Sequence, residues 1–249
     1  MTVLSPKTAE GALPVLFYIH GGGLVMGNRH QYLDDFAQFA STGEAVVVSV
    51  EYRLAPEHPA PAQLDDSYAG LEWVVEHAAD LGADPGRIVV AGVSAGGGIA
   101  LGLALAARDR GGPAIAGLVL IAPMLDDRFE LPSSRMVKDL PTNCDEVRFM
   151  WRSALGDSAG GPGVSPYVVP ARADSYAGLP PTYLDVGGSE GFRDEVIDVA
   201  RRMTLDGVAV DLHLWAGGSH GFCFMAPDAA ISQPALAARD AFIVRALRG

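Results

Sequence analysis

The chain has 249 residues, of which 49% are hydrophobic and 19% are charged, so we expect one globular domain with a large core rather than a disordered chain. The net charge is −12, and the 18 basic residues, 16 of them arginines, are scattered along the sequence, which argues against binding to nucleic acid. The sequence shows neither a signal peptide nor an apolar run near the ~18 residues of a membrane span, so we expect no membrane span. Cys144 and Cys223 are too few for a disulfide framework, and together these features predict a cytoplasmic protein.

Short β-branched runs alternate along the chain with longer helical patterns. In chain order, strands are predicted at residues 15–19, 45–50, 88–91, 118–121, 182–186 and 210–215, and helices at 32–40, 61–77, 95–108, 193–205 and 234–247. This alternation predicts an α/β fold, a mostly parallel twisted sheet flanked by helices on both faces. Apolar residues that alternate with polar ones from 208 to 214 indicate an edge strand.

One long segment interrupts this rhythm between the fourth and fifth predicted strands. Residues 124–178 span about fifty positions, are rich in proline and contain one short predicted helix at 145–154. An insertion at the carboxyl end of a parallel strand is where a lid over a site would lie, although a surface excursion is the simpler alternative. We therefore expect a single domain over residues 1–249, with residues 124–178 as a cap or lid insertion within it.

A candidate nucleophile follows the strand predicted at 88–91. Residues 92–96 read Gly-Val-Ser-Ala-Gly and open the next helix, which is the strand–turn–helix context of a nucleophile elbow around Ser94. Such a turn is tight, so it needs small residues on both sides of the serine, here Gly92 and Gly96. The alternative is a glycine-rich turn with an inert serine.

A glycine-rich loop, His20 to Gly23, follows the first predicted strand. An HGGG loop lets backbone N–H groups approach the oxyanion of a tetrahedral intermediate, and the N–H of Ala95 would be a further donor at the start of its helix. A phosphate loop is the competing interpretation, but neither GxxxxGK[ST] nor GxGxxG fits these residues. The pattern therefore favours an oxyanion hole.

A serine nucleophile needs a base and an acid, which follow it in the order Ser, acid, His in this type of fold. His220 is the histidine that lies in a loop beyond the last predicted strand, whereas His213 lies inside that strand. Three carboxylates, Glu190, Asp194 and Glu195, follow the strand at 182–186. The last two fall in the first turn of a predicted helix, where acids complement the helix dipole, so Glu190 is favoured.

With these motifs the chain resembles the hormone-sensitive-lipase-like family of α/β-hydrolases, the HGGG and GxSAGG carboxylesterases. Residues 51–57, Glu-Tyr-Arg-Leu-Ala-Pro-Glu, are close to the DYRLAPE segment of that family. The resemblance implies an α/β-hydrolase fold and an oxyanion hole formed by Gly22, Gly23 and Ala95. Val93 replaces the usual elbow Asp, and Glu190 stands where the family most often has Asp. Only 19 residues precede His20, so we expect a shortened N-terminal cap.

The predicted function is a serine carboxylester hydrolase that acts on small to medium acyl esters through an acyl-enzyme. Ser94 would attack, His220 would transfer the proton and Glu190 would orient the histidine, with no metal or organic cofactor. An acyltransferase or amidase would use the same triad, and a non-catalytic ligand-binding protein of the same fold is a third alternative. The expected partner is a small-molecule ester, and a homodimer is compatible with the sequence.

Overall fold

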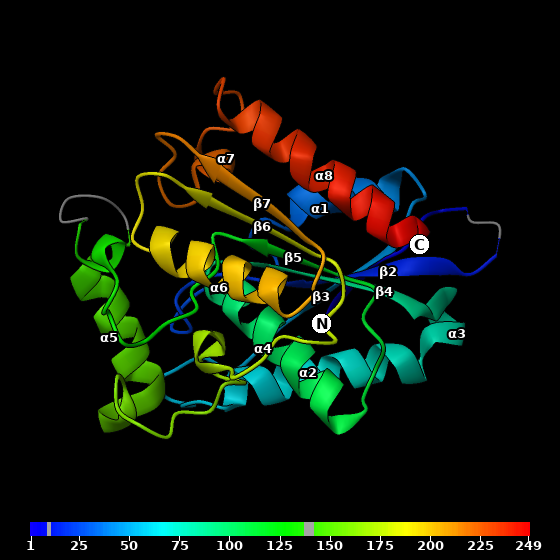
Figure 1. Ribbon diagram of the computed structural model, residues 1–249. Coiled ribbons are helices and arrows are strands. Elements are labelled where there is room, and N and C mark those ends of the chain that lie inside the picture. The colour runs from blue at the N-terminus through cyan, green and yellow to red at the C-terminus, as the bar shows by residue number, and fades with distance from the viewer. Residues whose placement is uncertain (9–10, 137–141) are drawn as a thin grey trace.

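A seven-stranded sheet runs through the centre of the molecule (Figure 1). The computed structural model describes residues 1–8, 11–136 and 142–249. The strands are β1 (Thr2–Leu4), β2 (Leu13–Ile19), β3 (Val46–Val50), β4 (Ala83–Val93), β5 (Gly117–Ile121), β6 (Thr182–Gly187) and β7 (Val210–Trp215). Within the described residues they lie in the order β1-β3-β2-β4-β5-β6-β7, with β1 antiparallel to β3 and every other pair parallel.

Helices cover both faces of this sheet. They are α1 (Leu33–Ser41), α2 (Ala62–Glu76), α3 (Ala78–Leu81), α4 (Ala95–Arg110), α5 (Cys144–Leu155), α6 (Arg193–Leu205), α7 (Phe222–Met225) and α8 (Ser232–Arg248). Figure 1 shows α1 and α8 on one face and α2, α4 and α6 on the other. The predicted α/β fold with a mostly parallel sheet is therefore confirmed. No helix in the described residues is both long and apolar enough to cross a membrane.

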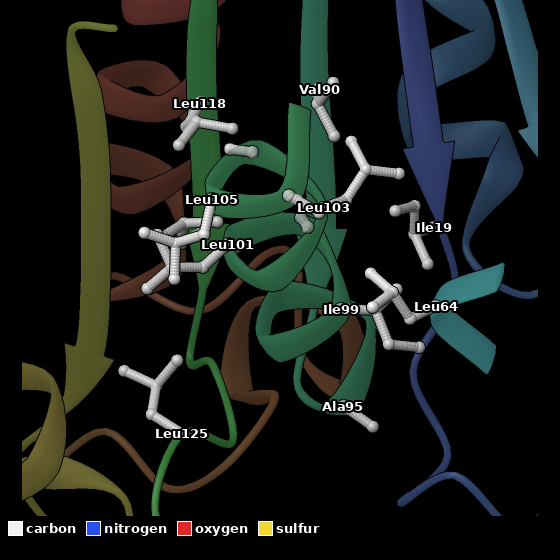
Figure 2. Close-up of a cluster of buried hydrophobic side chains, with 14 of the residues drawn as sticks. Ile19, Leu64, Val90, Ala95, Ile99, Leu101, Leu103, Leu105, Leu118 and Leu125 are labelled. Carbon is white, nitrogen blue, oxygen red and sulfur yellow. The ribbon is translucent and has the colours of Figure 1, made fainter. Parts of the chain in front are cut away.

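The period of two along each strand divides the core into two layers. On β2, Phe17 and Ile19 face the layer beneath α2 and α4, whereas Leu16 and Tyr18 face the layer beneath α1 and α8. Helix α4 is buried on all sides from Ala95 to Ala107, as expected for a helix that is apolar all round. Figure 2 shows Leu101 and Leu105 of α4 on the side of Leu118, and Ile99 beside Leu64 of α2. The turn that holds Ser94 therefore leads directly into a helix that is buried from Ala95 to Ala107.

Every predicted element is present, the short helices α3 and α7 were not predicted, and the strands differ from the prediction in three details. Strand β1 was not predicted, because three residues are too few to show an alternation. Strand β4 begins at Ala83 rather than at residue 88, because its first residues include Asp, Pro and Gly, which are unfavourable in strands. Strand β7 is the predicted edge strand, yet its apolar residues Leu212 and Leu214 are exposed, with 40% and 50% of their surface accessible. The alternation there marks the outer face rather than the core.

The segment 124–178 holds α5 and short 3₁₀ turns at Pro132–Arg135, Gly156–Ser158 and Pro170–Arg172. Helix α5 begins where Asn143 and Glu146 form a capping box, in which each side chain accepts a hydrogen bond from the other residue's backbone N–H. The helix predicted at 145–154 is thus present with one more residue at each end. Within residues 1–8 and 11–12 the structure has no helix before β2, and the expected shortening of an N-terminal cap stays a prediction.

Candidate active site

Ser94 lies on the sharp turn between β4 and α4. Its φ of 56° and ψ of −120° are rare for a residue with a side chain. A Cβ atom at Gly92 would lie 2.1 Å from the carbonyl oxygen of Gly96, and one at Gly96 would lie 2.2 Å from that of Ile19. The turn therefore leaves no room for side chains at the two predicted positions, which explains the G-x-S-x-G pattern sterically.

The structure brings Ser94, His220 and Glu190 together. The Nε2 atom of His220 lies 3.0 Å from Oγ of Ser94, and its Nδ1 atom lies 2.5 Å from Oε2 of Glu190. Glu190 is 4% exposed, and its other carboxylate oxygen accepts a hydrogen bond from the backbone N–H of Gly187 at 2.6 Å. The Phe192 ring lies edge-on to the imidazole with centroids 5.1 Å apart. These contacts hold the histidine between an alcohol and a buried carboxylate.

The two other candidate acids lie in the first turn of α6 and bond to the 124–178 insertion rather than to His220. A carboxylate oxygen of Asp194 accepts from the backbone N–H of Ser133 at 2.8 Å, and one of Glu195 accepts from the N–H of Leu125 at 2.7 Å. Burial raises the pKa of Glu195 well above its ordinary value, partly offset by its backbone hydrogen bonds. Both acids therefore fasten the start of the 124–178 insertion to α6. Sequence reasoning explained them only by the helix dipole and missed this long-range role.

The glycine loop after β2 adopts a conformation that favours glycine. Gly22 and Gly23 have φ values of 108° and 61°, and a Cβ atom on Gly22 would lie 2.0 Å from the carbonyl oxygen of Met26. Within residues 1–8, 11–136 and 142–249, the backbone N–H groups of Gly22, Gly23 and Ala95 donate no hydrogen bond to protein. Gly22 and Gly23 line the same pocket as Ser94, and Ala95 is the next residue of the chain, so three N–H groups without a partner in the described residues lie in the region of the Ser94 hydroxyl.

Tyr52 contacts the glycine loop through hydrogen bonds and ring stacking. Its hydroxyl donates to the carbonyl oxygens of His20 and Gly21 at 2.9 and 3.1 Å, and its ring stacks on the His20 ring at 4.1 Å. Burial raises the pKa of the Tyr52 hydroxyl, so it stays protonated and can donate. The sequence placed Tyr52 in a family-like segment, but nothing in it indicated a contact with residues 31 positions earlier.

A pocket of about 200 Å³ opens above Ser94. Its walls come from the glycine loop, from His220 and Gly221, and from Thr142 and Met150 of the 124–178 insertion. Met150 lies so close to Gly23 that a Cβ atom there would be 2.2 Å from the thioether sulfur. The insertion therefore supplies part of the wall directly over the free N–H donors.

A second carboxylate, Asp185, is buried behind this site. Its side chain accepts hydrogen bonds from the N–H of Ala122 at 3.3 Å and the hydroxyl of Tyr183 at 3.1 Å. Burial raises the pKa of Asp185 from 3.8 to about 6, the two hydrogen bonds lower it, and the nearby charge of Glu190 raises it further. The carboxyl group of Asp185 thus holds its proton more tightly in the folded protein than in the unfolded chain.

Replacing Asp185 by Asn should therefore stabilise the protein at high pH. Between pH 3.8 and about 6 the folded state binds more protons than the unfolded state, so the free energy of unfolding falls as the pH rises and stays low above that window. Removing the buried charge should raise the free energy of unfolding by roughly 1–3 kcal/mol at pH 8 and change it little at pH 4. Urea denaturation at both pH values measures this effect, with exposed Asp228→Asn as the control. Equal effects of Asp185→Asn at both pH values would contradict the prediction.

Comparison with known proteins gives a consistent picture. Residues 16–224 match the family model described as alpha/beta hydrolase fold. The chain is 40% identical over 220 residues to esterase LipI of Mycobacterium tuberculosis, covering 87% of this chain and 67% of LipI. It is 38% identical over 221 residues to carboxylesterase NlhH of the same species, covering 87% and 69%. A solved bacterial heroin esterase superposes with a TM-score of 0.95 at 40% identity, covering 99% of this chain and 79% of that one.

Proposed function

This chain belongs to the hormone-sensitive-lipase-like carboxylesterases of the α/β-hydrolase family, and we propose that Ser94, His220 and Glu190 carry out its ester hydrolysis. The observation that carries this proposal is the continuous contact from the Ser94 hydroxyl through the imidazole to the Glu190 carboxylate. It is the geometry of a nucleophile, a general base and an orienting acid. The chemistry is a two-step acyl transfer to water.

In the first step, Nε2 of His220 accepts the hydroxyl proton as Oγ of Ser94 attacks the ester carbonyl. The negative charge that develops on the carbonyl oxygen is stabilised by the N–H groups of Gly22, Gly23 and Ala95. The imidazolium then donates its proton to the leaving alcohol, and an acyl-enzyme remains on Ser94. Water attacks this ester by the same route, while Glu190 keeps Nδ1 protonated and stabilises the imidazolium.

The substrates we propose are esters with small to medium acyl groups. The pocket of about 200 Å³ lies below the ~300–1,000 Å³ of typical small-molecule sites, which favours compact substrates. We propose that residues 124–178 act as a cap within a single domain, since Thr142 and Met150 both line this pocket. Acyl transfer to an alcohol or amide cleavage would use the same acyl-enzyme and stay alternatives.

Rapid kinetics with p-nitrophenyl acetate tests the proposal against a non-catalytic binding protein. We expect nitrophenol release with turnover, and labelling of one residue per chain by an organophosphonate, identified as Ser94 by peptide mass spectrometry. The Ser94→Ala variant is the control and should not be labelled. Absence of both turnover and labelling in the wild type would favour the ligand-binding alternative, and labelling of a different residue would overturn the nucleophile.

Exchange of Glu190 for Gln should lower kcat by up to ~10⁴-fold, because an amide cannot stabilise the imidazolium or fix its tautomer. Asp194→Asn is the matched control, since Asp194 bonds to the Ser133 backbone rather than to His220. It should cost roughly 0.5–2 kcal/mol of stability and little rate. Steady-state kinetics and thermal melts on both variants decide the assignment. Loss of activity in Asp194→Asn alone would show that the acid has been misplaced.

Two further expectations from the sequence stay predictions. A homodimer would form along β7, the edge strand of the described sheet on which Leu212 and Leu214 are exposed. Light scattering on the purified chain would detect this dimer. We also propose a reducing, cytoplasmic environment, because Cys144 and Cys223 are both free thiols.

A further inference from the structure

A second hollow, of about 270 Å³, lies on the 124–178 insertion and shares no lining residue with the pocket above Ser94. We call it the arginine hollow, because Arg128, Arg135, Arg148 and Arg152 are among its lining residues. One quarter of the chain's 16 arginines thus gathers around one depression of a protein whose net charge is −12. The scatter of basic residues along the sequence concealed this clustering in space.

Three of these four guanidinium groups have no close carboxylate partner within the described part of the chain. Arg128 is neutralised by Asp126, which accepts two hydrogen bonds of 2.8 Å from its side chain. Arg148 lies 3.8 Å from Asp145, whose side chain is 93% exposed. Among residues 1–8, 11–136 and 142–249, Arg135 donates only to the carbonyl oxygen of Phe129. Arg152 makes no side-chain hydrogen bond or ion pair with residues 1–8, 11–136 or 142–249.

Among the described residues, the other acids near the hollow do not pair with these three guanidinium groups. Asp127 also lines the hollow, but its carboxylate is already paired with Arg172 at 2.6 Å and with the N–H of Gly160 at 2.7 Å. Arg148 and Arg152 are one helical turn apart on α5, a spacing at which like charges repel. An anion placed among Arg135, Arg148 and Arg152 would offset that repulsion and accept hydrogen bonds from their N–H groups.

The hollow is also partly prearranged. The Arg148 guanidinium lies over the Phe129 ring, 5.2 Å from its centroid, and the Phe129 carbonyl holds Arg135 at 3.1 Å. Phe129 itself has a φ of 56°, a conformation that L-residues rarely adopt. One strained residue therefore orients two of the three arginines, so that less side-chain freedom is lost when a ligand binds.

We propose that the arginine hollow binds a phosphoryl group, either as inorganic phosphate or on a small phosphorylated molecule. Guanidinium forks match phosphate oxygens bidentately, and a dianion with several acceptor oxygens suits three arginines that approach from two segments. The site goes beyond the esterase function. Helix α5 connects the arginine hollow to the active site, because Met150 lies between Arg148 and Arg152 in the sequence and contacts Gly23.

Titration calorimetry at constant ionic strength tests this proposal on the Ser94→Ala protein, so that catalysis cannot interfere. Inorganic phosphate should bind saturably, and the double substitution Arg148→Gln and Arg152→Gln should weaken binding at least about tenfold. The matched control is Arg201→Gln, an exposed arginine of α6 paired with Asp198, which should bind phosphate as the parent does. Non-saturable heats, or equal weakening in both proteins, would overturn the site.

Glycerol 3-phosphate and glycerol distinguish the source of the phosphoryl group. Tighter binding of glycerol 3-phosphate than of phosphate, with none of glycerol, would identify a phosphorylated metabolite, whereas equal affinities would identify phosphate itself. Circular dichroism checks that the double variant is folded, and Arg152→Gln alone provides a milder version of the test.

In the active enzyme, phosphate should change KM for p-nitrophenyl acetate, and this change should vanish in the double variant. Binding without any change in KM would overturn the link through α5.

Discussion

Ser94→Ala should lower kcat for ester hydrolysis by about 10⁶-fold, leaving only the ~10³–10⁴-fold acceleration over water that oxyanion stabilisation and binding provide. The alanine variant keeps the glycine loop and the pocket but has no oxygen to form the acyl-enzyme. Steady-state hydrolysis of p-nitrophenyl acetate measures the loss.

The control for this variant is its thermal midpoint. The side chain of Ser94 is small and contacts the fold mainly through His220, so the midpoint should stay close to that of the wild type. A folded Ser94→Ala protein that retained a tenth of the activity would rule out Ser94 as the nucleophile. A loss of both activity and cooperative melting would instead report misfolding, and Ser94→Cys would then serve as the milder replacement.

His220→Ala should reduce kcat to a similar degree, because no other side chain lies between the Ser94 hydroxyl and the Glu190 carboxylate in the described structure. The matched control is His213→Ala. His213 lies on β7, where its ring stacks on that of Trp215 at 5.5 Å and is tilted against that of Tyr183 at 5.1 Å. Its removal should cost roughly 1 kcal/mol of stability and leave the rate nearly unchanged.

Steady-state kinetics on the two histidine variants, with added imidazole, separates a catalytic from a structural role. Imidazole that enters the space left in His220→Ala should restore part of the rate, since it can accept the Ser94 proton. It should have no effect on His213→Ala. If His213→Ala were the inactive variant, the assignment of the base would be wrong, although Ser94 would stay the nucleophile.

Much of the site follows from the sequence because its backbone conformations are local. At Gly92, Gly96 and Gly22 the neighbouring backbone leaves no space for a Cβ atom, so the glycines are visible as motifs before any fold is known. The chain order of Ser94, Glu190 and His220 is likewise informative. Parallel strands bring their carboxyl ends to one edge of a sheet, so residues 126 positions apart were expected to meet there.

The fold class, the turn around Ser94 and the three residues proposed for the triad could therefore be predicted from the sequence. The burial of Glu195 and Asp185, the hydrogen bonds from Tyr52 to the glycine loop and the contact of Met150 with Gly23 became visible only in the structure. The same holds for the arginines from separate segments that gather in one hollow. The physical reason is that burial, pKa and charge clustering depend on which distant segments pack together, and local spacing carries no record of those contacts.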